Sequence, residues 1–231
     1  MGFLTLGIGQ NSPQKVPYGL YAEQLSGTAF TAPRAENKRT WFYRIRPTVT
    51  HRPFAPLDPA ATDILGSFSE SSDRCISTPN QLRWSPFPLP RKEVSDEKKI
   101  DFVQGMHTLC GSGSPSTRTG LAIHIYLANA SMVNRALNNS DGDFLIVPQQ
   151  GRLEIQTECG HIHAEQNEIV VIPRGVRFKV NLPDGPSRGY ILEVFDRHFD
   201  LPDLGPIGKN VLLVLLNVVF ILCNYRRQWS R

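Results

Sequence analysis

The chain has 231 residues, with 25 lysine and arginine against 21 aspartate and glutamate side chains and a net charge of +4. The stretch after Gly208 holds four of those cations and no acidic residue, so residues 1–208 carry 21 charges of each sign. A protein that binds nucleic acid needs a basic face on a folded domain. The balanced body therefore argues against nucleic-acid binding, and the length suits one core with an extension.

The cysteines and the first residues predict the compartment. The four cysteines lie far apart and form no CxxC pair: Cys75, Cys110, Cys159 and Cys223. They predict reduced thiols, not a disulfide framework or a zinc site. The opening stretch MGFLTLGIGQ has no positive charge before its apolar residues and is too short for a secretory signal. We therefore expect a cytoplasmic protein, in which the glycosylation sequons at Asn129 and Asn138 are coincidental.

Residues 1–98 are expected to form an irregular, loop-rich N-terminal part with few strands. Residues 41–45 (WFYRI) are a strand candidate, because aromatic and β-branched residues suit a pleated surface. Residues 55–79 are rich in Ser, Pro, Asp and Gly and are predicted as a loop. The mixed charges of residues 91–99 indicate a solvated connector.

Residues 99–208 change to short strands separated by glycine and proline turns. The stretch 152–157 alternates polar and apolar residues, which places Leu153 and Ile155 on one face of a strand. Strands at this spacing, with no long amphipathic helix, predict an all-β jelly-roll sandwich with an irregular N-terminal extension. The expected strands lie at 121–127, 144–147, 152–157, 168–172, 177–180 and 190–195.

Two stretches resemble the two halves of a cupin barrel. Residues 144–153 (FLIVPQQGRL) form a strand, glycine turn and strand pattern, and residues 167–180 (NEIVVIPRGVRFKV) turn at Pro-Arg-Gly. Metal-binding cupins carry two histidines and a carboxylate ahead of the first turn, and a third histidine after the second. Here Phe178 holds the third position, and residues 138–143 contain no histidine. A metal-free, cupin-like barrel is expected.

One stretch offers an alternative metal site. His161, His163 and Glu168, followed by Gly175, have the spacing of the first cupin metal motif. Ile155 stands where that motif has a glycine, and the same residues fit the approach to the second turn. Histidines two residues apart share one strand face, so a site is conceivable. We interpret both as exposed hairpin histidines, and a small metal cupin is the alternative.

The other histidines show no metal pattern. His124 lies in the apolar stretch LAIHIYL and is expected to be a hydrogen-bonded core histidine. His107 and His51 have no carboxylate partner at metal spacing. His198 lies near Asp196 and Asp200, where a salt bridge in a loop accounts for it.

No catalytic pattern is found either. The stretch 111–114 (GSGS) lacks the Gly-Lys-Ser/Thr ending of a phosphate loop and is expected to be a flexible turn. No serine lies in a Gly-x-Ser-x-Gly elbow. We therefore assign no catalytic, cofactor-binding or metal-binding residue to this chain.

Six blocks of sequence, taken in order, carry a family resemblance. They lie at residues 17–51 (PYGLYAEQLSGTAFTAPRAENKRTWFYRIRPTVTH), 80–90 (NQLRWSPFPLP), 101–111 (DFVQGMHTLCG), 121–132, 139–151 (NSDGDFLIVPQQG) and 188–208 (RGYILEVFDRHFDLPDLGPIG). Together they resemble homogentisate 1,2-dioxygenase over nearly all of residues 11–208.

The resemblance implies an activity and a cofactor. The family opens the ring of homogentisate with O2, giving maleylacetoacetate in tyrosine and phenylalanine catabolism. It uses one Fe(II) held by two histidines and a glutamate, which leaves positions open for substrate and O2. Its β-rich N-terminal domain precedes a C-terminal domain that carries these ligands, and its subunits form hexamers built from trimers.

The resemblance ends near Gly208. Residues 209–231 depart from the family, and residues 211–223 are apolar except for Asn217. This stretch is shorter than the roughly 20 residues that a membrane-spanning helix needs, so a tail from read-through, a frameshift or a gene-model error is preferred over a membrane anchor. We expect a truncated dioxygenase without the iron ligands, inactive alone. The alternative is a non-catalytic β-domain that associates with full-length subunits.

Overall fold

The structure is a computed structural model that describes residues 19–26, 32–34, 36–37, 39–55, 62–68, 75–76, 78, 80–81, 83–90 and 99–200. The expected tail, residues 209–231, lies outside them. The chain divides into two compact units, Met1–Pro56 and Leu57–Arg231, which are described separately. The boundaries expected near residues 98 and 208 stay predictions.

The first unit contains an antiparallel ribbon of two strands. Strand β1 (Tyr21–Ser26) pairs with β2 (Arg39–Arg44), and a short 3-10 helix, η3 (Thr48–Thr50), follows. The Glu23 carboxylate joins ribbon and helix, because it accepts the Thr48 N–H at 2.6 Å and lies 3.2 Å from Nε of Arg44. Hydrogen bonds from Thr48 lower the pKa of Glu23. The strand predicted at 41–45 is confirmed as β2, which begins two residues earlier and ends one residue earlier.

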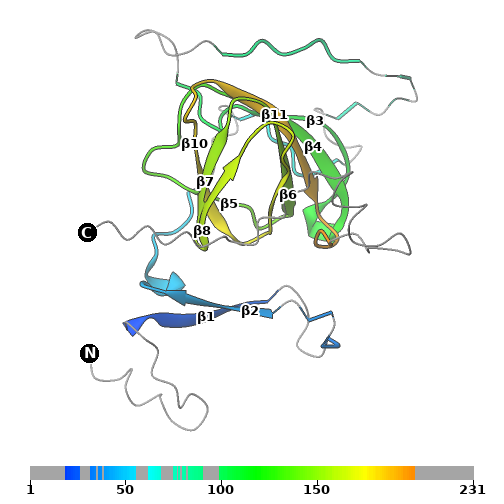
Figure 1. Cartoon of the computed structure of the whole chain (residues 1–231). Helices are drawn as coiled ribbons and strands as arrows, with labels where there is room; N and C mark the ends of the chain where they lie inside the picture. The colour runs from blue at the N-terminus through cyan, green and yellow to red at the C-terminus, as the bar shows by residue number, and fades with distance from the viewer. Residues whose placement is uncertain are drawn as a thin grey trace, which may run out of the picture. The chain divides into compact units, whose positions relative to one another are not determined.

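The second unit is a sandwich of two antiparallel sheets (Figure 1). The larger sheet has the order β3-β4-β11-β6-β9, and the smaller has the order β5-β10-β7-β8. A 3-10 turn, η4 (Pro115–Thr117), joins β3 and β4. The strands are β3 (Met106–Ser114), β4 (Thr119–Ala128), β5 (Leu137–Asn138), β6 (Asp143–Gln150), β7 (Leu153–Thr157), β8 (Gly160–Ala164), β9 (Val170–Ile172), β10 (Arg177–Asn181) and β11 (Ser187–Val194).

The chain crosses repeatedly between the two sheets. It leaves the larger sheet after β6, forms the β7–β8 hairpin in the smaller sheet, returns as β9, crosses again as β10 and ends in the middle of the larger sheet as β11. This crossing pattern is that of a jelly roll. The predicted all-β, cupin-like sandwich is confirmed, and each strand expected between residues 121 and 195 has a counterpart.

Side chains of both sheets alternate between the interior and the outside. The inward positions are mostly apolar, as burial of one face of each sheet requires, with His124, Ser187 and Glu193 as polar exceptions in the larger sheet. The core includes Ala122, Tyr126, Phe144, Ile146 and Ile191 from the larger sheet and Leu153, Ile155, Phe178 and Val180 from the smaller.

The stretch 111–114 was wrongly predicted as a flexible turn. It forms the end of β3, with Gly111 opposite Ala122 in the ladder. A side chain at Gly111 would come within 2.3 Å of the Phe68 ring. The glycine therefore provides space for Phe68, and its role depends on a residue outside the local sequence.

A substitution at Gly189 tests the packing of β11 in the sandwich. A methyl group there would lie 2.4 Å from the Val147 carbonyl oxygen and 2.6 Å from the Tyr126 ring. Because neither neighbour is the free end of a flexible chain, we expect Gly189→Ala to lower the free energy of unfolding by at least about 2 kcal/mol. Urea denaturation measures this.

The matched control is Gly66→Ala, whose new methyl group would find only Asp141 Oδ2, at 3.8 Å. This change should alter stability by less than about 1 kcal/mol. Equal losses in the two variants would contradict the described approach of β11 to Tyr126.

Candidate functional site

The place where metal-binding cupins have their third histidine is filled by an aromatic cluster. Phe178 on β10 is 1% exposed, and its ring lies 6.3 Å from that of Phe102 and 6.4 Å from that of Phe144. Tyr126 extends the cluster, with its ring centroid 4.9 Å from that of Phe102. These rings offer no ligand atom suited to Fe(II), which takes imidazole and carboxylate donors in such sites. The residues present therefore do not fit an iron ion.

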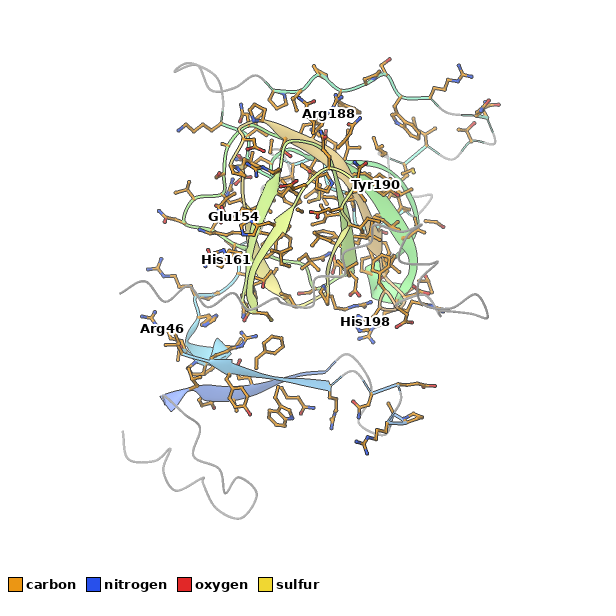
Figure 2. The ribbon with its side chains drawn as sticks, in the orientation of Figure 1. Arg46, Glu154, His161, Arg188, Tyr190 and His198 are labelled. Carbon is orange, nitrogen blue, oxygen red and sulfur yellow. The ribbon has the colours of Figure 1, made fainter. Side chains whose placement is uncertain are left out.

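The alternative site at β8 points away from the barrel. His161 and His163 are exposed on the outer face, whereas Ile162 between them is buried. Figure 2 shows His161 near Glu154. Nδ1 of His161 lies 4.0 Å from the Glu154 carboxylate on β7. Glu168 accepts the Glu165 N–H at 2.7 Å and closes the turn before β9. The interpretation as exposed hairpin histidines is confirmed.

His124 is a core histidine, as expected, and it belongs to a buried polar chain. Its Nε2 lies 3.1 Å from Glu193 Oε2, and its Nδ1 lies 2.9 Å from the Thr108 hydroxyl. That hydroxyl accepts the Leu65 N–H at 2.8 Å, so its own proton can point to His124. Asn139 donates to the other oxygen of Glu193 at 2.5 Å. The chain joins β3, β4 and β11 and satisfies each buried group that it contains.

Asp141 lies beside this hydrogen-bonded chain, and its N–H donates to Oδ1 of Asn139 at 3.0 Å. Partial burial raises the pKa of Asp141, and the charge of Glu193 adds to the effect. A raised carboxyl pKa can mark a functional site. Here His124 is fully buried and Glu193 is 5% exposed, so neither can reach a substrate in solution. We interpret the group as structural.

A second buried carboxylate connects three segments at one end of the sandwich. Asp143, which is 1% exposed, accepts the backbone N–H of Arg174 at 2.9 Å and lies 2.9 Å from Nδ1 of His198. The guanidinium of Arg174 also donates to the carbonyls of Phe195 and Arg197. A buried carboxylate is tolerated when it is paired in this way. The sequence missed this partner of His198, because Asp143 lies far earlier in the chain.

His107 also has a partner that its local sequence did not show. Its Nδ1 lies 3.0 Å from Asp63 Oδ2, and its ring stacks on Phe87 at 5.5 Å. Asp63 lies 44 residues before His107, so the pair could not be found among sequence neighbours. For His51, the structure shows a backbone N–H donated to the Thr48 carbonyl at 3.1 Å.

Neither a metal cluster nor a membrane-spanning helix is found among the described residues. Among them, no three His, Cys, Asp or Glu side chains gather closely enough to hold a metal ion. Over the same part of the chain, no helix has the length and apolar character needed to cross a membrane.

The family follows from comparison with known proteins. A family model described as the N-terminal part of homogentisate 1,2-dioxygenase matches residues 4–218. The chain belongs to the homogentisate 1,2-dioxygenase family. The match extends ten residues beyond Gly208, where the sequence analysis placed the end of the resemblance.

Curated members of the homogentisate 1,2-dioxygenase family align over 208 residues. The chain is 61% identical to the Drosophila melanogaster enzyme, 58% to that of Oryza sativa subsp. japonica and 55% to that of Homo sapiens. These alignments cover 90% of this chain but only 45%, 43% and 44% of those proteins. The chain thus spans less than half the length of the relatives that it matches.

Solved cupin structures overlap part of the chain. A cupin-2 domain protein from Shewanella frigidimarina superposes with a TM-score of 0.29 and 22% identity, over 32% of this chain and 70% of its own. The cupin domain of Schizosaccharomyces pombe Cnp3 gives a TM-score of 0.32 and 12% identity, over 42% and 69%.

Substitutions in the aromatic cluster and at the β8 histidines should have very different effects on the free energy of unfolding. Phe178→Ala removes a fully buried ring and should lower the free energy of unfolding by about 3–5 kcal/mol. His163→Ala changes an exposed side chain and should alter it by no more than about 0.5 kcal/mol. Urea denaturation gives the two values, and metal analysis of the same samples should find equal iron in wild type and His163→Ala. Less iron in the variant would support the alternative metal site.

The raised pKa of Tyr126 predicts that the protein loses stability at alkaline pH. Burial raises the pKa of Tyr126 from 10.0 to about 12, although its hydroxyl meets Ser187 Oγ at 3.3 Å. The unfolded chain releases this proton first, so the contribution to stability is complete below pH 10 and is lost as the pH rises toward 12. Between pH 8 and pH 11 the free energy of unfolding should fall less in Tyr126→Phe than in the wild type, by about 1 kcal/mol. An unchanged difference would show that Tyr126 is accessible to water.

Proposed function

We propose that this chain acts in the O2-dependent ring opening of homogentisate to maleylacetoacetate, as the N-terminal β-domain of a homogentisate 1,2-dioxygenase. The observation that carries the proposal is the family match over residues 4–218, with identities of 55–61% to the relatives from human and Drosophila melanogaster. The substrates are homogentisate and O2, and tyrosine and phenylalanine catabolism is the setting. We place the protein in the cytoplasm, because its separated cysteines suit a reducing compartment.

The Fe(II) ion of the family is held, in this proposal, by the part of the dioxygenase that the chain does not align with. The barrel interior supports this division, because Phe178 stands at the sequence position of the third cupin histidine and packs against Phe144 and Phe102. The two imidazoles closest to carboxylates in the interior, His124 and His198, already bind Glu193 and Asp143. The described residues then supply a stable sandwich instead of reacting groups.

A chimera tests the family role. Residues 1–208 of this chain would replace the aligned part of the Drosophila melanogaster enzyme, and homogentisate-dependent O2 uptake would be measured after anaerobic loading with Fe(II). We expect turnover of the same order as the parent enzyme, because the sandwich core is compatible with the rest of the protein. A chimera that folds and binds iron but does not turn over would contradict the proposed role.

The location of the iron ligands is tested separately with a protein of these 231 residues. After the same loading, its O2 uptake should equal that of a Fe(II) blank without protein. Turnover near that of the full-length relative would show that the chain carries its own reactive iron, and the assignment of no metal ligand here would be wrong.

The second candidate function is a non-catalytic β-domain that joins full-length subunits in a homo-oligomer, a trimer or a hexamer of the family. The observation in its favour is the β1–β2 ribbon, where Trp41 and Tyr43 are 60% and 59% exposed. A two-stranded ribbon is marginally stable alone, and exposed aromatic residues are common at protein interfaces. Co-expression with a tagged full-length relative tests this role: co-elution supports it, and persistent separate elution contradicts it.

A further inference from the structure

Arg188 is a cation without a partner on the outer side of the larger sheet. Within the part of the chain that the structure describes, its Nε is buried and has no hydrogen-bond partner. Other arginines of the sandwich meet carboxylates, as Arg152 meets Asp184 at 2.7 Å and Arg174 meets Asp143 at 3.2 Å. A buried donor without an acceptor is costly and needs an explanation. The Arg188 side chain therefore points to an acceptor that the described residues do not supply.

A hollow of about 420 Å³ lies next to Arg188. Gly189 and Tyr190, the two residues that follow it on β11, both line this hollow. Its apolar wall includes Ile125 of β4 and Val147 of β6, which lie on either side of Tyr190 in the ladder. Sites for small molecules have volumes of this order, with apolar walls and a few polar groups that orient the ligand. We call this place the Arg188 hollow.

A β-bulge in β6 forms the polar border of the Arg188 hollow. Opposite Arg188 and Gly189 the ladder skips Gln149, which is the extra residue of the bulge. Gln149 lines the hollow, and its carbonyl accepts a hydrogen bond from Nε2 of Gln166 at 2.8 Å. Bulges often occur next to binding sites, where they change the direction of a side chain. Amide groups thus adjoin both the apolar wall and the cation.

Arg188 and Tyr190 provide two donors on the same side of β11. Burial alternates along this strand: Ser187 and Gly189 are buried, whereas Arg188 and Tyr190 are not. Residues two apart on a strand share a face and lie about 7 Å from each other. Figure 2 shows Arg188 and Tyr190 following one another along β11. Burial raises the pKa of Tyr190, so its hydroxyl keeps its proton at neutral pH and can donate a hydrogen bond.

We propose that the Arg188 hollow binds a small organic acid, with its carboxylate on Arg188 and its apolar body against Tyr190 and the neighbouring aliphatic wall. The planar guanidinium matches a carboxylate with two parallel hydrogen bonds. An inorganic anion would satisfy the charge but has no apolar part to cover the wall. This inference goes beyond the dioxygenase proposal and does not depend on it.

The surroundings of Arg188 favour a small molecule over a segment of another protein. An extended segment binds a sheet by adding a strand to a free edge. Strand β11 has no such edge, because β4 and β6 pair with it on its two sides. The contact available is therefore a concave one, formed by side chains around Tyr190. An acidic peptide remains an outcome that the test distinguishes.

The first test uses benzoate as the probe and benzamide as a neutral molecule of the same shape. Nuclear magnetic resonance of the full ¹⁵N-labelled chain at constant ionic strength follows the amides of residues 188–190. Benzoate should shift them saturably with a Kd on the order of 1 mM, as its size allows. Benzamide should bind at least about tenfold more weakly, because it brings no charge to Arg188.

Two results of this titration would overturn the proposal. One is equal binding of benzoate and benzamide, which would show that the cation does not select the ligand. The other is the absence of a saturable shift with benzoate. If the acidic peptide acetyl-Glu-Phe-amide then shifted the same amides, Arg188 would belong to a contact with a protein partner instead.

A pair of arginine variants locates the bound probe. Arg188→Gln should weaken benzoate binding at least about tenfold, because the carboxylate loses its charged partner. The matched control is Arg118→Gln, which removes the same charge from an exposed position after η4, at the other end of β4. It should leave the Kd of benzoate unchanged. Equal weakening in the two variants would mean that benzoate responds only to net charge, and the site would be wrong.

The stability of Arg188→Met gives a result that a purely structural arginine would not produce. Methionine keeps an apolar stem and removes the buried donor that has no partner. Without probe, we expect the urea midpoint of Arg188→Met to equal or exceed that of the wild type, as residues kept for binding often cost stability. Benzoate should raise the midpoint of the wild type alone. A lower midpoint in the variant without probe would contradict the proposal, since Arg188 would then serve the fold.

Discussion

The larger sheet depends on how closely β11 approaches Tyr126. Gly189 allows this approach, because the Tyr126 ring and the Val147 carbonyl occupy the volume that any side chain there would need. Strand β11 pairs with β4 on one side and β6 on the other, and its register shifts between Arg188 and Gly189. The buried Tyr126 ring in turn contacts Phe102 in the aromatic cluster. One glycine therefore lets the last strand of the sandwich close over the core.

The interior charges of the sandwich are paired and not poised for reaction. Glu193 binds His124 and Asn139, and Asp143 binds Arg174 and His198. A lone buried carboxylate would be costly, and these partners offset that cost. Each pairing also joins strands or loops that are distant in sequence. The paired carboxylates thus give the sandwich a fixed framework.

The two faces of β4 and β11 differ in composition. The inward face carries the hydrogen-bonding groups of Tyr126, His124 and Glu193, whereas the outward face is largely aliphatic and mostly half-buried. The chain aligns with less than half of each relative compared. Within the part of the chain that the structure describes, the larger sheet thus presents a largely apolar outer face.

The sequence by itself determined the strand-rich architecture and the family. These follow from local alternation, from glycine and proline turns, and from blocks of sequence that need no partner to be recognised. It also placed His124 in the core and His161 and His163 on the surface. Only the tertiary structure decided which carboxylate each histidine meets: His198 binds Asp143, and His107 binds Asp63. It also decided that residues 111–114 form the end of a strand and that the outward side of β11 is the more apolar one. The reason is that pairing register and packing join residues that the local sequence does not connect.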